Sequence, residues 1–164
     1  MVRVLIIGNS DLPERNLVND LIDSSDKIIA CDGAVERCLD ASINVDYVVG
    51  DMDSLENTTL AELPKMGIEV QKLDDQNNID LQKAINFSSE IGADRINIIG
   101  VEGGSNQHQF ASYWCLFETE VECYIHLSDS IVSMVKNGRV KLSIEKEKEF
   151  SIFAIGDCDG VNVS

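Results

Sequence analysis

Short apolar runs recur along this chain, and segments with helical spacing separate them. Continuous runs of this kind are typical of parallel strands that are buried on both faces. The expected strands are Val4–Ile7, Lys27–Cys31, Val45–Val49, Ile68–Leu73, Ile96–Gly100 and Glu122–Leu127. Because strands that alternate with helices form βαβ units, the pattern predicts a largely parallel sheet with right-handed crossovers.

The intervening segments carry apolar residues three or four positions apart, as amphipathic helices do. The expected helices include Leu17–Ile22, Val35–Leu39, Leu55–Met66, Ile79–Ile91 and Gln107–Phe117. Residues 1–127 are therefore predicted to form a three-layer, Rossmann-like α/β domain with a mostly parallel sheet. The aromatic residues Tyr113, Trp114 and Phe117 are expected to pack in its core.

The pattern changes after Leu127. Ile131–Val135, Val140–Ile144 and Phe150–Ile155 resemble strands without intervening helices, and Asn137-Gly138 favours a hairpin. Residues 128–164 are predicted to begin an antiparallel β unit that is incomplete. Its unprotected edge leads us to expect either a missing carboxyl-terminal part or a partner chain.

The charge of the chain excludes some partners. Its 164 residues include 29 Asp and Glu but only 13 Lys and Arg, which gives a formal net charge of −16. This charge argues against non-specific binding to nucleic acid or to an anionic membrane. An anionic substrate would need a metal ion or helix amino termini to bind here.

The cysteines and the first residues of the chain bear on the cellular compartment of the protein. The five cysteines are odd in number and show no zinc-like spacing, so reduced, mostly packed thiols are expected. The first apolar run, Val4–Ile7, is too short for a signal peptide or a membrane span. We therefore predict a cytoplasmic protein.

Two carboxylates follow the third expected strand, in the stretch Tyr47–Ser54. Asp51 and Asp53 stand after Gly50 with one residue between them. Carboxylates placed together repel unless a cation lies between them, and oxygen ligands favour Mg²⁺. The alternative is an Asp-rich turn in which Ser54 begins a helix.

Polar residues follow three other expected strands as well. Asp32 follows the second, Asp74–Asp80 the fourth and Gly103–His108 the fifth. Because carboxyl ends of parallel strands share one edge of a sheet, these groups are expected to converge on one crevice. Taken singly, Asp80 also suits a helix amino terminus, and His108 and His126 also suit structural roles.

The ordered motifs resemble those of the thiamin pyrophosphokinase family. The matching stretches are Cys31-Asp32-Gly33-Ala34, Gly50-Asp51-Met52-Asp53-Ser54, Asp75-Gln76-Asn77-Asn78-Ile79-Asp80 and Gly103-Gly104-Ser105-Asn106-Gln107-His108. The resemblance covers about residues 28–115, and Phe153–Gly156 with Gly160-Val161 resembles the start of the family's second domain.

The resemblance implies Mg²⁺-dependent transfer of pyrophosphate from ATP to the hydroxyl of thiamin, with release of AMP, by a homodimer. It implies that residues 1–127 are the catalytic domain, which binds the nucleotide and Mg²⁺. It implies metal binding by Asp51, Asp53 and Asp80, with Asp32 beside them in the catalytic group. It also implies nucleotide or substrate contacts by Gln76, Asn78, Gly103, Gly104, Ser105, Gln107 and His108. One of the aspartates would act as general base, and the sequence leaves open which one.

Several positions depart from the family pattern. Ser105 stands where the family has Arg, Gln107 where it has Asp, and Ile79 where it has Thr; Ala34 replaces a Gly and Ser112 an Asn. Three functions therefore stay open: transfer to thiamin, the same transfer to another hydroxymethyl heterocycle such as a pterin, or ligand binding without catalysis.

Overall fold

The computed structural model describes residues 1–75, 77–136, 138 and 148–161. The chain divides into two compact units, Met1–Met134 and Val135–Ser164.

The first unit is built on a sheet whose described part has seven strands in the order β4-β3-β2-β1-β5-β6-β7. The first six strands pair in parallel, and β7 pairs with β6 in the antiparallel sense. The strands are β1 (Arg3–Ile7), β2 (Lys27–Cys31), β3 (Tyr47–Gly50), β4 (Glu69–Lys72), β5 (Arg95–Ile99), β6 (Glu122–His126) and β7 (Ile131–Ser133).

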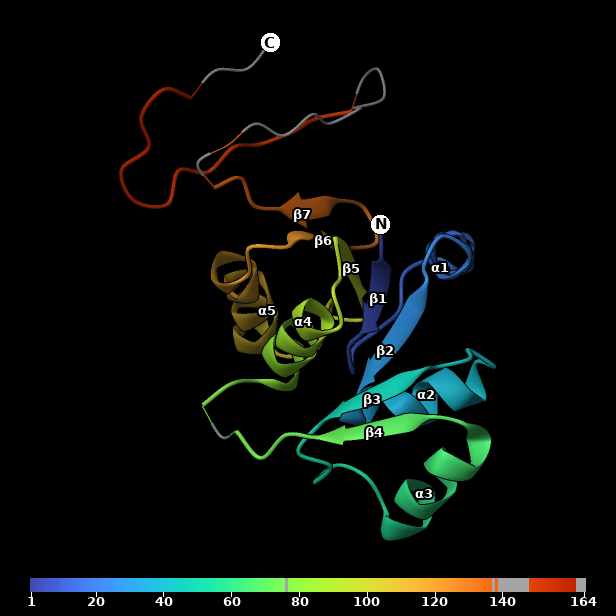
Figure 1. Cartoon of the computed structure of the whole chain (residues 1–164). Coiled ribbons are helices and arrows are strands. Elements are labelled where there is room, and N and C mark those ends of the chain that lie inside the picture. The colour runs from blue at the N-terminus through green and yellow to red at the C-terminus, as the bar shows by residue number, and fades with distance from the viewer. Residues whose placement is uncertain (76, 137, 139–147, 162–164) are drawn as a thin grey trace. The chain divides into compact units, whose positions relative to one another are not determined.

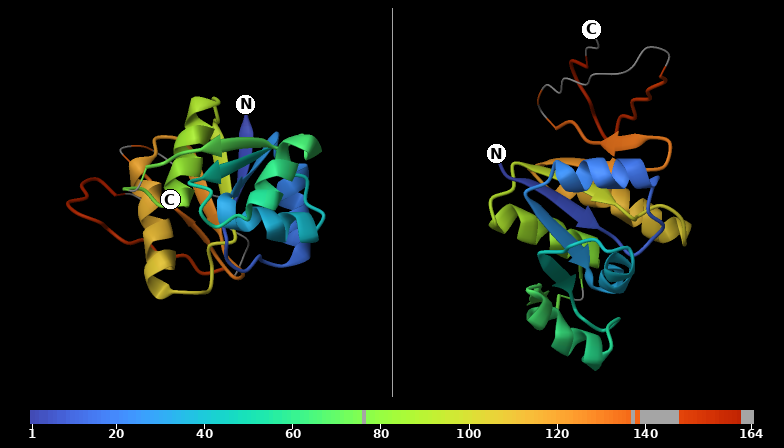
Figure 2. Two further views of the ribbon diagram at one scale, coloured as in Figure 1. Left: turned by 90° about the horizontal axis from the view of Figure 1, so that it is seen from below. Right: turned by 90° about the vertical axis from the view of Figure 1, so that its right-hand side faces the viewer.

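Helices cover both faces of this sheet (Figure 1). The helices α4 and α5 lie side by side on one face, and α1 and α2 lie on the other (Figure 2). The α-helices are α1 (Arg15–Asp23), α2 (Val35–Asp40), α3 (Asn57–Glu62), α4 (Asp80–Glu90) and α5 (Asn106–Glu118), and 3₁₀ turns span Asp32–Ala34 and Leu63–Met66.

The hydrophobic core lies between these layers. Val4, Leu5, Ile6 and Ile7 of β1 are fully buried, because β1 is central in the sheet and both its faces are covered. This arrangement confirms the predicted three-layer α/β fold with a mostly parallel sheet.

The structure differs most from the sequence prediction in three elements of this unit. The expected helix Leu55–Met66 is divided: α3 ends at Glu62, and a 3₁₀ turn with Pro64 near its start follows. Proline lacks an N–H donor, so the α-helical hydrogen bonds cannot continue through it. The strand β3 starts at Tyr47 rather than Val45, and β7 extends the main sheet instead of a separate one.

The aromatic residues of α5 differ from the prediction too. Trp114 is 48% exposed and stacks between Phe110 and Phe117, with ring centroids 6.1 and 5.0 Å away. The prediction that Trp114 packs in the core is wrong. Its apolar neighbours lie three and four residues away on the same helix, so it contacts them along the helix surface.

The second unit carries no helix or strand in its described residues. Phe150–Ile155, expected as a strand, has no strand assignment, and its apolar side chains are exposed. The expected partner Val140–Ile144 and Asn137 of the expected hairpin lie outside the described residues. The antiparallel unit over residues 128–164 therefore stays a prediction.

All five cysteines are free, and Cys31, Cys38, Cys115 and Cys123 are buried, as expected for packed thiols.

In the part of the chain that the structure describes, no helix has the length and apolarity to cross a membrane.

Candidate functional site

The strand order reverses beside β1. From β1 the chain proceeds to β2, β3 and β4 on one side, and β5 then returns to the other side of β1. Ligands of open α/β sheets bind outside the carboxyl ends of the strands at such a point. Gly8 and Gly100 follow β1 and β5 there, and a Cβ on Gly8 would lie only 2.6 Å from the carbonyl oxygen of Gly100.

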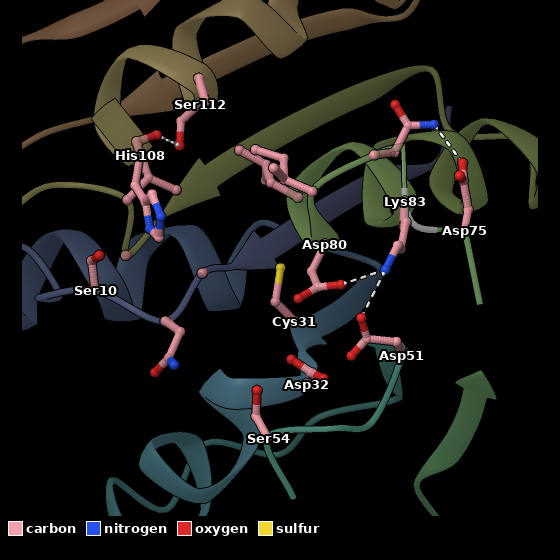
Figure 3. Close-up of a pocket in the computed structure, with 18 residues that line it drawn as sticks. Ser10, Cys31, Asp32, Asp51, Ser54, Asp75, Asp80, Lys83, His108 and Ser112 are labelled. Atoms are coloured by element: carbon pink, nitrogen blue, oxygen red, sulfur yellow. Dashed lines mark hydrogen bonds and ion pairs between the residues drawn. The ribbon is translucent and has the colours of Figure 1, made fainter. Parts of the chain in front are cut away.

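A pocket of about 390 Å³ opens at this edge of the sheet (Figure 3). Its acidic side contains Asp32, Asp51, Asp75 and Asp80 together with Lys83, and Ser10, His108 and Ser112 lie on the other side. The remaining lining residues are Gly8, Asn9, Cys31, Ser54, Asn78, Ile79, Leu81, Gly100, Val101 and Ala111.

Three carboxylates meet in this pocket. One oxygen from each of Asp32, Asp51 and Asp80 lies within 4.8 Å of the other two. Asp32 follows β2, Asp51 follows β3 and Asp80 begins α4, so three separate elements bring them together. The predicted convergence of Asp32, Asp51 and Asp80 is found in the structure.

The Asp32 carboxylate is held by the backbone. It is 2% exposed and accepts hydrogen bonds from the N–H groups of Gly33 and Met52. Gly50 leaves room for it, since a Cβ there would come within 2.8 Å of the Asp32 side chain. Burial, and then the negative charge of Asp80, raise the pKa of Asp32 above its ordinary value.

The backbone turns sharply between Asp51 and Asp53. Met52 has a φ of 66°, a left-handed conformation that is uncommon for residues other than glycine. This turn directs the Met52 N–H to Asp32 and the Asp53 N–H to the Asp51 carboxylate, at 3.0 and 3.2 Å. The Asp53 N–H, and then Lys83, lower the pKa of Asp51.

Asp53 itself lies outside the carboxylate group. Its side chain is exposed and does not line the pocket, so the metal-binding role that the resemblance implies for Asp53 stays a prediction. After the left-handed turn at Met52, the backbone N–H of Asp53 donates to the Asp51 carboxylate, while the Asp53 side chain is exposed.

Lys83 supplies the positive charge of the site. Its side chain is only 4% exposed, and its Nζ lies 2.9 Å from Oδ1 of Asp80 and 3.5 Å from Oδ2 of Asp51 (Figure 3). Burial alone would lower the pKa of Lys83, but the hydrogen bond and charge of Asp80, together with Asp51, raise it.

The loop before α4 adds further polar groups. Asp75 accepts hydrogen bonds from the Asn77 N–H and the Asn78 side chain, and both Asp75 and Asn78 line the pocket. The hydrogen bond from Asn77 lowers the pKa of Asp75. Gln76, predicted to contact the nucleotide, lies outside the described residues.

The glycine-rich loop before α5 contributes less than expected. Gly103, Gly104, Ser105 and Gln107 do not line the pocket, whereas His108 does. The Ser105 hydroxyl lies 2.7 Å from Oε1 of Gln107, so these two side chains are engaged with each other. The first turn of α5 thus places one of its predicted contacts, His108, in the pocket.

Several lining residues were not predicted. Lys83 lies among the apolar residues of α4 and three positions after Asp80, a spacing at which ion pairs form. That spacing was the available signal for Lys83. Asn9 and Ser10 lie in the loop after β1 and Gly100 follows β5, and only the reversal of strand order brings these residues to the pocket.

The donor set fits a divalent cation. Three carboxylates with oxygens at this separation offer the hard oxygen ligands that Mg²⁺ binds. Among the described residues, no ion pair neutralises Asp32, although Asp51 and Asp80 share Lys83. A cation would supply the missing charge.

Residues 18–127 match the catalytic domain of thiamin pyrophosphokinase. The chain belongs to the thiamin pyrophosphokinase family. The matched range contains β2 through β6 and the three carboxylates, whereas β1 and the lining residues Gly8, Asn9 and Ser10 precede it. The recognition made from the motifs is confirmed.

Solved structures of this family show the same fold. A thiamin pyrophosphokinase family protein from Enterococcus faecalis is 20% identical, with a TM-score of 0.64 over 79% of this chain and 63% of that one. The thiamine pyrophosphokinase of Bacillus subtilis is 21% identical, with a TM-score of 0.60 over 76% and 60%. Yeast thiamin pyrophosphokinase is 16% identical, with a TM-score of 0.64 over 76% and 58%.

At these identities the likeness shows the fold alone. The chain spans about three fifths of the length of these three structures. A search of the curated proteins found no match to the chain.

Proposed function

We propose that this protein transfers a pyrophosphoryl group from Mg²⁺-bound ATP to the hydroxyl of thiamin and releases AMP. The observation that carries the proposal is the group formed by Asp32, Asp51 and Asp80, which lies within the matched family domain at the reversal of strand order. The match to the family's catalytic domain supports thiamin as the acceptor.

The site has what phosphoryl transfer requires, namely positioning and neutralisation of charge. Asp32, Asp51 and Asp80 would hold Mg²⁺, which neutralises phosphate oxygens when it is bound. Asp32 is fixed by two backbone N–H groups, so it is ordered before any ligand binds. The polar side chains of Ser10, His108 and Ser112 suit an uncharged part of a substrate.

Two residues of the glycine-rich loop bear on the identity of the acceptor. Ser105 and Gln107 stand where the family has Arg and Asp, and they lie outside the pocket. The hydroxymethylpterin alternative and binding without turnover therefore remain outcomes of the test. A homodimer and a cytoplasmic location are further proposals that rest on the family resemblance and the sequence.

The test is AMP release from ATP by the full chain. It is measured with thiamin, with a hydroxymethylpterin and without acceptor, each with Mg²⁺ or with EDTA. We expect AMP release that needs both Mg²⁺ and thiamin.

If AMP is released with the pterin but not with thiamin, the acceptor is a pterin and the reaction is still transfer of a pyrophosphoryl group. If the folded protein binds Mg²⁺ and ATP but releases no AMP with either acceptor, the proposed transfer is wrong and a ligand-binding role replaces it.

A further inference from the structure

One cationic side chain lines an otherwise acidic pocket. Lys83 is the only Lys or Arg among the described residues that line it, beside Asp32, Asp51, Asp75 and Asp80. Polyphosphate is anionic, so an ATP molecule entering this pocket meets four carboxylates and one ammonium group. The ammonium is committed to two of those carboxylates.

The geometry of Lys83 leaves part of its binding capacity unused. An ammonium group has three N–H donors, and the structure accounts for two, one to Asp80 and one to Asp51. The side chain is 4% exposed, so its stem is fixed within the protein and its Nζ is presented to the pocket. The third donor is available to an acceptor that enters there.

The charge balance gives this donor a role. Lys83 offsets one of the three negative charges of Asp32, Asp51 and Asp80. A divalent cation bound to the same carboxylates would offset the other two and would compete with Lys83 for their oxygens. The whole group, Lys83 included, would then carry no net charge, and the ammonium of Lys83 could donate to a phosphate oxygen.

We infer that Lys83 exchanges partners during ligand binding. It is the counter-ion of Asp51 and Asp80 before a divalent cation binds, and it donates to a phosphate group of the nucleotide afterwards. This inference rests on the proposed function and assigns a nucleotide-binding role to a residue outside the predicted motifs. A purely structural counter-ion would hold the carboxylates in place and would not contact the ligand.

Removing the charge of Lys83 should therefore change the affinities of the protein for two ligands in opposite directions. Lys83→Met should bind Mg²⁺ alone about tenfold more tightly, because one nearby positive charge no longer repels the ion. The same variant should bind a non-hydrolysable ATP analogue, in saturating Mg²⁺, about tenfold more weakly, because a charge-assisted hydrogen bond is lost.

The experiment titrates the full chain by calorimetry at constant ionic strength, first with Mg²⁺ and then with the analogue in Mg²⁺. Lys72→Met is the matched control, because it removes the same charge from an exposed side chain that pairs with Asp74 instead. Should Lys83→Met fail to fold, Lys83→Gln replaces it, since the amide keeps a donor for Asp80 without the charge.

Tighter Mg²⁺ binding with weaker analogue binding in the Lys83 variant, and neither change in Lys72→Met, would establish the exchange. Unchanged analogue binding in the Lys83 variant would overturn it, whatever happens to Mg²⁺. If the wild-type chain binds neither Mg²⁺ nor the analogue, the proposed function fails and this inference fails with it.

Discussion

His126 of β6 is a buried histidine whose surroundings should make the stability of the protein depend on pH. Its Nε2 lies 2.9 Å from Oδ1 of Asn97, and its Nδ1 is buried without a hydrogen-bond partner among the described residues. Burial disfavours the charged imidazole and lowers the pKa of His126 below its ordinary value of 6.5. The expected structural role of His126 agrees with this position, away from the pocket.

Stability should fall as pH drops through 6.5, because the unfolded chain takes up a proton at His126 that the folded chain resists. Between the lowered pKa of the folded state and the ordinary value of 6.5, the free energy of unfolding changes with a slope that approaches about 1.4 kcal/mol per pH unit. His126→Gln, whose amide can still donate to Asn97, should remove this part of the slope in urea unfolding between pH 7 and pH 5.

His108→Gln is the matched control. It changes the other histidine, in the pocket, and leaves His126 in place, so the slope should persist. An equal slope in wild type and His126→Gln would show that His126 does not carry the pH dependence.

The individual site residues differ in how far sequence could predict them. Asp32, Asp51 and Asp80 each follow a strand or begin a helix, and parallel topology brings such positions together. Sequence alone could not exclude Asp53 from the carboxylate group. The backbone turn before Asp53 depends on the left-handed φ of Met52, and a methionine at that position does not predict such a φ. The sheet order also had to be known before Ser10 or Asn9 could be placed.

The elements β1 and β5 meet at the floor of the pocket without any side chain between Gly8 and Gly100. Gly100 has a φ of 72°, and a Cβ on it would lie 2.5 Å from the carbonyl oxygen of Gly8. The two backbones pass so closely that neither position tolerates a larger residue without movement of the main chain. This close approach brings the loops after the two strands to the same pocket.

Gly8→Ala should therefore lower the free energy of unfolding by about 1–3 kcal/mol, the usual cost of overpacking. Gly92→Ala is the comparison, since Gly92 has a φ of 83° but open space around its missing Cβ. It should cost only about 1 kcal/mol, from backbone conformation alone. Urea unfolding measures both, and equal losses would contradict the close approach at Gly8.

Element positions followed from sequence better than element ends. Lys27–Cys31 is β2 as expected, because a short apolar run in a parallel sheet has sharp limits. The helix expected at Leu55–Met66 is divided instead, since its apolar spacing continues past Glu62 whereas its hydrogen bonds stop near Pro64. The pairing of β7 with β6 depends on tertiary contacts that local spacing does not contain.

At the scale of the whole molecule, negative charge dominates. The chain has a formal net charge of −16, and mutual repulsion destabilises a compact state. Any salt should relieve this repulsion by screening. A cation that binds only the folded carboxylate group should stabilise the protein further, by mass action.

Mg²⁺ should therefore raise the free energy of unfolding above the value in NaCl of equal ionic strength. At a Mg²⁺ concentration 100 times the dissociation constant, the gain is about 2.7 kcal/mol. Asp80→Asn should lose this gain but keep the response to NaCl. Equal stabilisation by the two salts would mean that both only screen the repulsion between carboxylates, and that Mg²⁺ does not bind at Asp80.

The measurement that tests the account most directly compares AMP release by Asp51→Asn and Asp53→Asn, in Mg-ATP and thiamin. Both variants remove one negative charge from neighbouring positions, but only the Asp51 carboxylate belongs to the group with Asp32 and Asp80. Asp51→Asn should lose about 100-fold or more of the rate, since altering even groups behind metal ligands costs 10–100-fold.

Asp53→Asn should stay within about threefold of wild type, as exposed substitutions do, and its backbone N–H still donates to Asp51. Equal losses in the two variants, or a larger loss in Asp53→Asn, would contradict the site described for Asp32, Asp51 and Asp80.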